Sequence, residues 1–296
     1  TVTVTTSSTV SGSLIVDAGS TLDCQTTTGN NFGAIPYATA GGSGTIRISS
    51  ASATAEFPAG DFGLFFESAG GTCEYYSTGT QDFTLPIATA SPTVISIDTY
   101  KNLILAPGAG RTISMPDKNY IIYNDIEVNG DPTGIASLTN AAARIYTVNH
   151  DLNITQGILD LGSGFANTMT MLGDVMVSNG GTLQSPASGS VTHNLYLNGN
   201  LTNEGIISLN NASKSNLTFQ GSGSRNFDGS NGSASVSLNS LIVNIGSNNS
   251  TELDISTLGS FSAPTNNWVT LTSGNLKWSK SGSITLTDAV GDFIIP

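Results

Sequence analysis

The sequence predicts an all-β chain folded as a single-stranded parallel β-helix, a solenoid with about 23 residues per coil. A short phrase recurs along the chain: a small polar residue, an apolar residue, any residue, a second apolar residue, and Gly a few positions later. The copies begin at Asn102, Asp125, Asp151, Asp174, Asn194, Asn216 and Ser240 and read NLILAPG, DIEVNG, DLNITQG, DVMVSNG, NLYLNG, NLTFQG and SLIVNIG. They begin 23, 26, 23, 20, 22 and 24 residues apart. A period of this length, carried by a strand signal, is typical of stacked repeats.

The alternation inside each phrase predicts a strand. Apolar side chains two positions apart, such as Leu103 and Leu105, lie on one face of a strand. No segment between the phrases has a 3.6-residue period long enough for a helix, which argues against leucine-rich repeats and helical solenoids. A second strand signal appears in GILDL from Gly157, GTLQS from Gly181 and GIISL from Gly205. Two or three short strands per coil, joined at Gly, Asn and Ser corners, make one turn of a β-helix.

Residues 1–296 are expected to form one β-helix domain of about twelve coils, stacked about 4.8 Å apart. The length would allow two domains, but no linker or block of charge divides the chain. Regular coils are expected over about 101–296, and a loop-rich region over about 1–100. Because the sequence opens on the strand-like TVTVTT and closes on DFIIP without a recognisable anchor, we expect a segment of a longer chain.

The first third contains the same strand signals at wider spacing. They read SLIVDAG from Ser13, TLDC from Thr21, TIRIS from Thr45 and TCEYY from Thr72. The segments 25–44, 50–62 and 81–99 are rich in small residues, Gly or Pro, and we expect them to protrude as loops.

Cys24 and Cys73 each occupy an inward strand position. If the strand TIRIS forms a coil between them, the two residues lie two layers apart, about 9–10 Å, which is too far for a disulfide. If the segment 25–44 and the strand after it form one enlarged coil, the two cysteines are neighbours and could be joined. We expect buried thiols, with the disulfide as the alternative.

The charge excludes two classes of partner. The formal net charge is −12, from 21 acidic and nine basic residues. Nucleic acid binding needs clustered Lys and Arg, which the chain lacks, and anionic membranes are disfavoured for the same reason. No run approaches the roughly 18 apolar residues of a membrane-spanning helix. We therefore expect neither nucleic acid binding nor membrane insertion.

The first position of the repeated phrase predicts a ladder of side chains at one corner of the solenoid. Side-chain oxygens and amides there would bond to the backbone of the same or the adjacent coil. The ladder is expected to consist of Asn102, Asp125, Asp151, Asp174, Asn194 and Asn216. Three successive carboxylates, Asp125, Asp151 and Asp174, would repel one another unless backbone N–H groups or Ca²⁺ compensate. The sequence contains no cofactor motif, and Ca²⁺ is the one ion that this ladder leaves open.

Catalysis has little support in the sequence. Glycoside hydrolases need two clustered carboxylates, and lyases need a base with a neutraliser for the substrate carboxylate. His150 beside Asp151 is the one His–acid neighbour, and adjacent strand residues face opposite ways, so no working pair is expected. No catalytic residue is assigned. Sugar binding without catalysis stays open, because Tyr76 should point outward and Tyr37 lies in a predicted loop, where aromatic rings could stack on a glycan.

Several strings resemble the repeats of very large Bacteroidetes cell-surface proteins. They are AGGSGTIRISSASATAEFPAG from Ala40, FESAGGTCEYYSTGTQDF from Phe66, YKNLILAPGAGRTI from Tyr100 and DIEVNGD from Asp125. The resemblance covers roughly residues 13–210, and the rest more loosely. It implies a right-handed β-helix in an exported, adhesin-like chain of the kind delivered by type IX secretion, although the shared motifs are structural.

We therefore expect a non-enzymatic, extracellular structural or adhesive segment of a bacterial cell-surface protein. It would act as a stiff stalk or an adhesion surface. Its partners would be a surface glycan or another cell-surface protein, together with neighbouring domains of the longer parent chain. The alternative is a β-helix that binds or degrades a polysaccharide. A lateral groove with three or more carboxylates or basic residues would favour that alternative.

Overall fold

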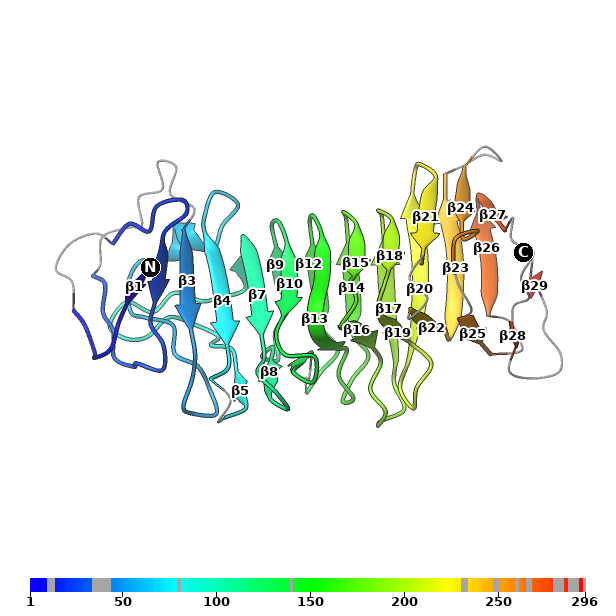
Figure 1. Cartoon of the computed structure of the whole chain (residues 1–296). Coiled ribbons are helices and arrows are strands. Elements are labelled where there is room, and N and C mark those ends of the chain that lie inside the picture. Colours follow the sequence, from blue (N-terminus) through cyan, green and yellow to red (C-terminus); the bar gives the residue numbers. More distant parts are fainter. Residues whose placement is uncertain are drawn as a thin grey trace.

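The chain forms an elongated parallel β-helix, in which the strands stack side by side from the N-terminal to the C-terminal end (Figure 1). The computed structural model describes residues 1–9, 14–33, 44–78, 81–138, 141–229, 234–246, 251–258, 261–264, 268–278, 285–286 and 293–294. Among them, one 3-10 turn, Gly63–Phe65, is the helical element, and no helix is long and apolar enough to cross a membrane. The prediction of an all-β solenoid is confirmed.

Each regular coil contributes one strand to each of three parallel faces. Face 1 contains twelve strands in register: β1 (Val2–Thr3), β2 (Thr21–Asp23), β3 (Thr45–Ile48), β4 (Thr72–Tyr76), β7 (Asn102–Ala106), β10 (Ile126–Asn129), β13 (Leu152–Asp160), β15 (Val175–Val177), β18 (Leu201–Asn203), β21 (Arg225–Asp228), β24 (Glu252–Asp254) and β27 (Asn275–Lys277).

Face 2 follows face 1 along each coil, and β13 is long enough to belong to both. Its other strands are β5 (Phe83–Thr84), β8 (Thr112–Ser114), β11 (Ile135–Ser137), β16 (Gly181–Gln184), β19 (Ile206–Ser208), β22 (Ser235–Ser237), β25 (Phe261–Ala263) and β28 (Thr285–Leu286). The second strand signal of the sequence, in GILDL, GTLQS and GIISL, lies on this face.

Face 3 closes the coil and leads into face 1 of the next. It contains β6 (Thr99–Tyr100), β9 (Tyr120–Ile122), β12 (Ile145–Val148), β14 (Thr168–Met171), β17 (Thr192–Leu197), β20 (Lys214–Gly221), β23 (Ser240–Ile245), β26 (Val269–Ser273) and β29 (Phe293–Ile294). Because nearly every described strand pairs with a coil on either side, backbone hydrogen bonding runs along the whole stack.

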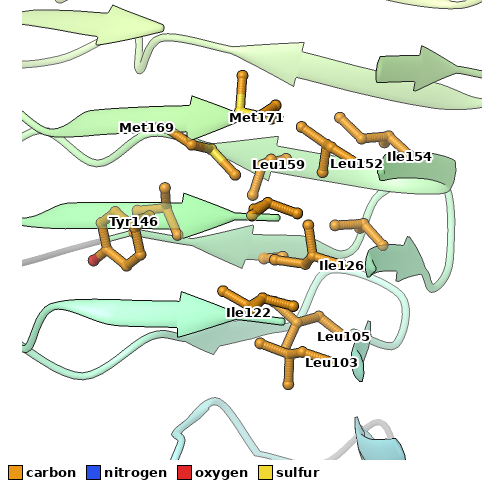
Figure 2. Packing of buried hydrophobic residues seen from close by; sticks show 14 of the residues in the cluster. Leu103, Leu105, Ile122, Ile126, Tyr146, Leu152, Ile154, Leu159, Met169 and Met171 are labelled. Atoms are coloured by element: carbon orange, nitrogen blue, oxygen red, sulfur yellow. The ribbon is translucent and has the colours of Figure 1, made fainter. Parts of the chain in front are cut away.

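The core is a column between the three faces. Figure 2 shows Leu103, Ile126 and Leu152 from face 1 pointing inward with Leu159 from face 2 and Met169 from face 3. Their burial follows from strand alternation, since the residues between them point to solvent. Each buried side chain of this size contributes about 1.5–3 kcal/mol of burial free energy. Tyrosine rings extend the column, with Tyr120 stacked on Tyr100 and Tyr146 at centroid distances of 5.9 and 6.3 Å.

The prediction that 50–62 protrudes as a loop is wrong. Phe57 and Phe62 in this segment are buried, and their rings pack edge to face at 5.1 Å with an interplanar angle of 79°. Phe65 and Phe66 join them, and Phe66 reaches Tyr100 at 5.9 Å. The small residues around Phe57 let the backbone lie close to the core, so the aromatic rings fill the interior of the N-terminal coils. The composition of this segment resembles that of a loop because small residues surround the two phenylalanines. It also forms no regular strand, since its pairing with neighbouring coils consists of single bridges such as that between Phe57 and Thr89.

The segment 81–99 is also integrated into the solenoid, since it supplies β5 and β6 and buries Phe83, Leu85 and Ile97. The predicted excursion is therefore confined to residues between Leu85 and Ile97, where Ile87 and Val94 are exposed. Part of the predicted loop 25–44 lies outside the described residues.

Cys24 and Cys73 are free thiols, and both are buried. The strand β3 lies between β2 and β4 on face 1, so that Leu22, Ile46 and Cys73 stand one above another. The two cysteines are thus separated by a complete coil, and the prediction of buried thiols is confirmed. Burial raises the pKa of Cys24 to about 12 and that of Cys73 well above its usual range.

Candidate functional site

The most regular polar feature is a ladder at the corner where face 3 leads into face 1. We call it the Asx ladder, and it consists of Asn102, Asp125, Asp151, Asp174, Asn200 and Asn226. In each step the side-chain Oδ1 of one member accepts the backbone N–H of the next, over 3.4, 3.1, 2.7, 2.7 and 3.0 Å. The steps span 23, 26, 23, 26 and 26 residues, one coil each.

Asn194 and Asn216 do not belong to this ladder, which corrects the sequence prediction. They lie within β17 and β20 on face 3, where they stand in register and the Nδ2 of Asn216 donates to the Oδ1 of Asn194 over 3.2 Å. The repeated phrase therefore occurs on two faces. The short interval of 20 residues between Asp174 and Asn194 marks the change of face.

The members that continue the ladder, Asn200 and Asn226, were missed. Each precedes an inward residue of face 1, Leu201 and Phe227, as the earlier members do. The second apolar position of the phrase is filled by Asn203 and Gly229, so the local pattern is weaker than NLYLNG and NLTFQG on face 3. A search at a fixed period of 23–26 residues would have found them.

Two glycines make room for the ladder. A Cβ at Gly173 would collide with the Oδ1 of Asp151, and a Cβ at Gly199 with the Oδ1 of Asp174. Gly173 precedes Asp174, and Gly199 precedes Asn200, and the backbone N–H groups of Asp174 and Asn200 donate to these two carboxylates. The Gly residues at these corners thus follow from the close approach of a carboxylate to the backbone of the next coil.

His150 lies in the middle of the ladder, between two carboxylates. Its Nδ1 is 2.6 Å from the Oδ1 of Asp125 and 3.3 Å from the Oδ2 of Asp151. The expectation that His150 and Asp151 face opposite ways is wrong, because His150 belongs to the turn before β13 and strand alternation does not apply there. That they form no working catalytic pair stays a prediction. The hydrogen bond to Asp125, with the charge of Asp151, raises the pKa of His150, which favours a positive charge between the two carboxylates.

Within the part of the chain that the structure describes, Asp125, His150 and Asp151 form the group that could hold a cation, since one ligand atom from each lies within 4.8 Å of the others. The predicted Ca²⁺ ligands Asp125, Asp151 and Asp174 do not form one cluster. Asp174 lies in the next coil, where its Oδ1 accepts both the backbone N–H and the Nδ2 of Asn200, at 2.7 and 3.2 Å. A cluster that includes an imidazole nitrogen differs from the all-oxygen shells that Ca²⁺ prefers.

Of the two tyrosines predicted to bind glycans, Tyr37 lies outside the described residues. Tyr76 points outward, as expected, but its polar group and one face of its ring are occupied. Its hydroxyl donates to the Oδ1 of Asp23 over 2.8 Å, and the guanidinium of Arg47 lies 4.3 Å from its ring centroid. Arg47 in turn pairs with Glu74 at 2.8 Å. Tyr196, between the inward Leu195 and Leu197, is an outward aromatic residue of face 3 that the sequence reading passed over.

A groove opens at the corner where face 2 leads into face 3, and the sequence reading missed it. It has a volume of about 530 Å³ and spans the coils of β6, β9 and β12. We call it the corner groove, and its principal residues are Asp98, Asp117, Lys118, Asn119, Ile121 and Arg144. These residues come from three stretches that are 19 and 23 positions apart, so no local motif marks them. The predicted period could have grouped them, since each lies just before or within a strand of face 3.

Two ion pairs organise the corner groove. The Nε of Arg144 donates to the Oδ1 of Asp117 over 2.6 Å, and Lys118 Nζ lies 3.7 Å from the Oδ2 of Asp98. Arg144 lowers the pKa of Asp117, whose pKa is also lowered by the backbone N–H groups of Ala141 and Ala142. Lys118 Nζ donates further to Ser96 Oγ at 2.7 Å and to the carbonyl of Ile97 at 3.1 Å. Because both ion pairs are partly exposed, they contribute little to the free energy of unfolding, and their main effect is to fix the positions of the side chains.

Comparison with known proteins gives no match among protein-family models, curated proteins or solved structures.

Proposed function

We propose that the chain is a non-enzymatic structural and adhesive segment of an exported bacterial cell-surface protein, a stiff rod that displays its lateral faces. The observation that carries this proposal is the Asx ladder, in which three successive carboxylates bind backbone N–H groups from one coil to the next. A hydrogen-bonded corner of this kind, alongside a continuous core, stiffens a solenoid and leaves its flanks free for contacts.

The geometry of the His150 cluster argues against glycoside hydrolysis at the ladder. The ligand oxygens of Asp125 and Asp151 lie within 4.8 Å of each other, and His150 stands between them. Retaining enzymes hold their two carboxyl groups about 5–5.5 Å apart and inverting enzymes about 6.5–9.5 Å apart, with the sugar between them. Here the imidazole occupies that position, and the Oδ1 of Asp125 also accepts the N–H of Asp151.

The proposed location rests on the sequence resemblance to large Bacteroidetes surface proteins, which implies type IX secretion and a longer parent chain. The composition is compatible with it, since 10% of the residues are charged and the net charge is −12. An antibody raised against the purified chain and applied to intact cells of the source organism tests this location. Labelling of intact cells supports surface exposure, and labelling only after lysis contradicts it.

A polysaccharide-cleavage screen tests the non-enzymatic assignment. Neutral and acidic polysaccharides are incubated with the purified chain, with and without Ca²⁺, and new reducing ends and unsaturated uronates are measured. We expect no product. Product that disappears in the Asp125→Asn and His150→Ala variants would overturn the proposal and make the ladder a catalytic site.

The alternative, a β-helix that binds a polysaccharide, is favoured by the corner groove. Its two carboxylates and two basic residues meet the criterion of three or more such groups in one lateral groove. This observation concerns binding, and it is compatible with an adhesive rod.

A further inference from the structure

The corner groove combines fixed charges, the amide of Asn119 and an exposed apolar floor. Ile121 provides that floor, with 42% of its surface exposed, and Thr99 lies beside it in register on face 3. Asn119 stands at the rim, where its Oδ1 accepts the backbone N–H of Ile145 over 2.9 Å. The volume of about 530 Å³ falls within the range of about 300–1,000 Å³ that is usual for small-molecule sites.

The charges in the corner groove cancel. Asp98 and Asp117 supply two negative charges, and Lys118 and Arg144 supply two positive ones, each within an ion pair. A strongly anionic ligand would meet the carboxylates, and a strongly cationic ligand the basic groups. Hydrogen-bonding capacity is nevertheless dense, since carboxylates accept, guanidinium and ammonium groups donate, and Asn119 carries an amide that can do both.

The strand at the centre of the groove is closed to an incoming peptide backbone. β9 already pairs on both sides, through Thr99 with Ile121 and through Ile121 with Thr147. Among the described strands of face 3, β6 is the end strand, so a peptide could extend the sheet only beyond Thr99, on the side away from Ile121. Binding over Ile121 must therefore come from side chains that match many hydroxyl groups along one edge of a ligand and an apolar face along the other.

We propose that the corner groove binds a neutral oligosaccharide. Sugar rings present hydroxyl groups at their edges and C–H groups on their faces, and they carry no net charge. The hydroxyl groups would bond to Asp98, Asp117 and Arg144, while a ring face packs on Ile121. Lys118 acts as a positioning residue that holds Asp98 through the ion pair. The inference deepens the adhesive part of the proposed function, because it supplies the class of ligand.

A glycan array of neutral and acidic oligosaccharides, followed by titration calorimetry with the best neutral hexasaccharide, tests this proposal. We expect binding to one or more neutral structures. Arg144→Gln and Asp117→Asn should each weaken binding about tenfold or more, as loss of a hydrogen bond to a charged group would. Ile121→Arg places a bulky side chain in the groove from an exposed position and should abolish binding while the fold is retained.

Arg111→Gln is the matched control, since Arg111 is similarly exposed and pairs with Asp82 at 4.0 Å elsewhere on the solenoid. This variant should bind like the unchanged protein, and circular dichroism should show all four variants folded. Failure to bind any neutral oligosaccharide, binding of acidic ones alone, or equal affinity in the Ile121→Arg variant would overturn the proposal. A protein that binds no sugar but is displayed on intact cells would still satisfy the structural role, so the two proposals fail separately.

Discussion

Replacement of Asp174 by Ala removes one complete step of the Asx ladder. The Oδ1 of Asp174 accepts the backbone N–H of Asn200 at 2.7 Å and its Nδ2 at 3.2 Å. Hydrogen bonds to a charged acceptor are worth about 1.5–3 kcal/mol when sheltered from water. Because this corner is exposed and water replaces part of the loss, we expect Asp174→Ala to lower the free energy of unfolding by about 1–2 kcal/mol.

Asp174→Asn is the matched control, because the amide keeps an Oδ1 acceptor and removes the charge. We expect it to remain within about 0.5 kcal/mol of the unchanged protein. Urea unfolding followed by circular dichroism measures the stability of both variants.

Hydrogen exchange of the Asn200 amide isolates the local effect, since long repeat arrays can unfold in parts. Exchange at Asn200 should accelerate in the Ala variant and stay slow in the Asn variant. If both variants lose stability equally, charge and not the acceptor position matters. If neither changes exchange at Asn200, the ladder does not hold the coils together.

Three other outcomes follow from the same geometry. Leu152→Ala, at a fully buried core position, should cost about 2–5 kcal/mol, whereas Asn153→Ala on the outer side of β13 should cost under about 0.5 kcal/mol in urea unfolding. Because the folded-state pKa of His150 is raised, its pairing stabilises the fold below the unfolded pKa of about 6.5 and is lost as pH rises through the folded pKa. His150→Ala should therefore destabilise more at about pH 5.5 than at about pH 9, and an equal loss at both values would contradict the pairing. Cys24 and Cys73 should react with a thiol reagent only after denaturation, and rapid reaction of either in the native protein would show that the buried position is wrong.

The regular coils could be predicted from sequence because strand alternation and corner residues recur in the same order. Leu103 and Leu105 are two positions apart, which predicts that both point to the same face of a strand, and both are buried. The separation of Cys24 from Cys73 also follows from strand order, since TIRIS supplies the coil between them. These inferences need only the period of the strand and the stacking of coils.

The polar site was harder to predict because its members are close in space and distant in sequence. The same phrase serves face 1 and face 3, so Asn194 and Asn216 were grouped with residues of another face. His150 was assigned strand geometry although it belongs to a turn, where the side chain is free to reach Asp125. The corner groove depends on the exact length of the connections before β6, β9 and β12, which short-range patterns do not set.

The N-terminal third shows a different limit. Phe57 and Phe62 lie among small and polar residues, a composition that resembles a surface loop. They are buried because the wide N-terminal coils need large side chains to fill the interior. Volume requirements of this kind appear only once the coils are assembled.

Cross-linking between coils tests the stacked register most directly. Asn153, Met176 and Thr202 stand one above another on the outer side of face 1. Cysteines at 153 and 176 should be about 4.8 Å apart between Cα atoms and should form a disulfide on mild oxidation. Cysteines at 153 and 202 should be about 10 Å apart and should not. Mass spectrometry of the oxidised proteins should find a link in the first variant alone, whereas a link only in the second, or in neither, would contradict the three-faced coil.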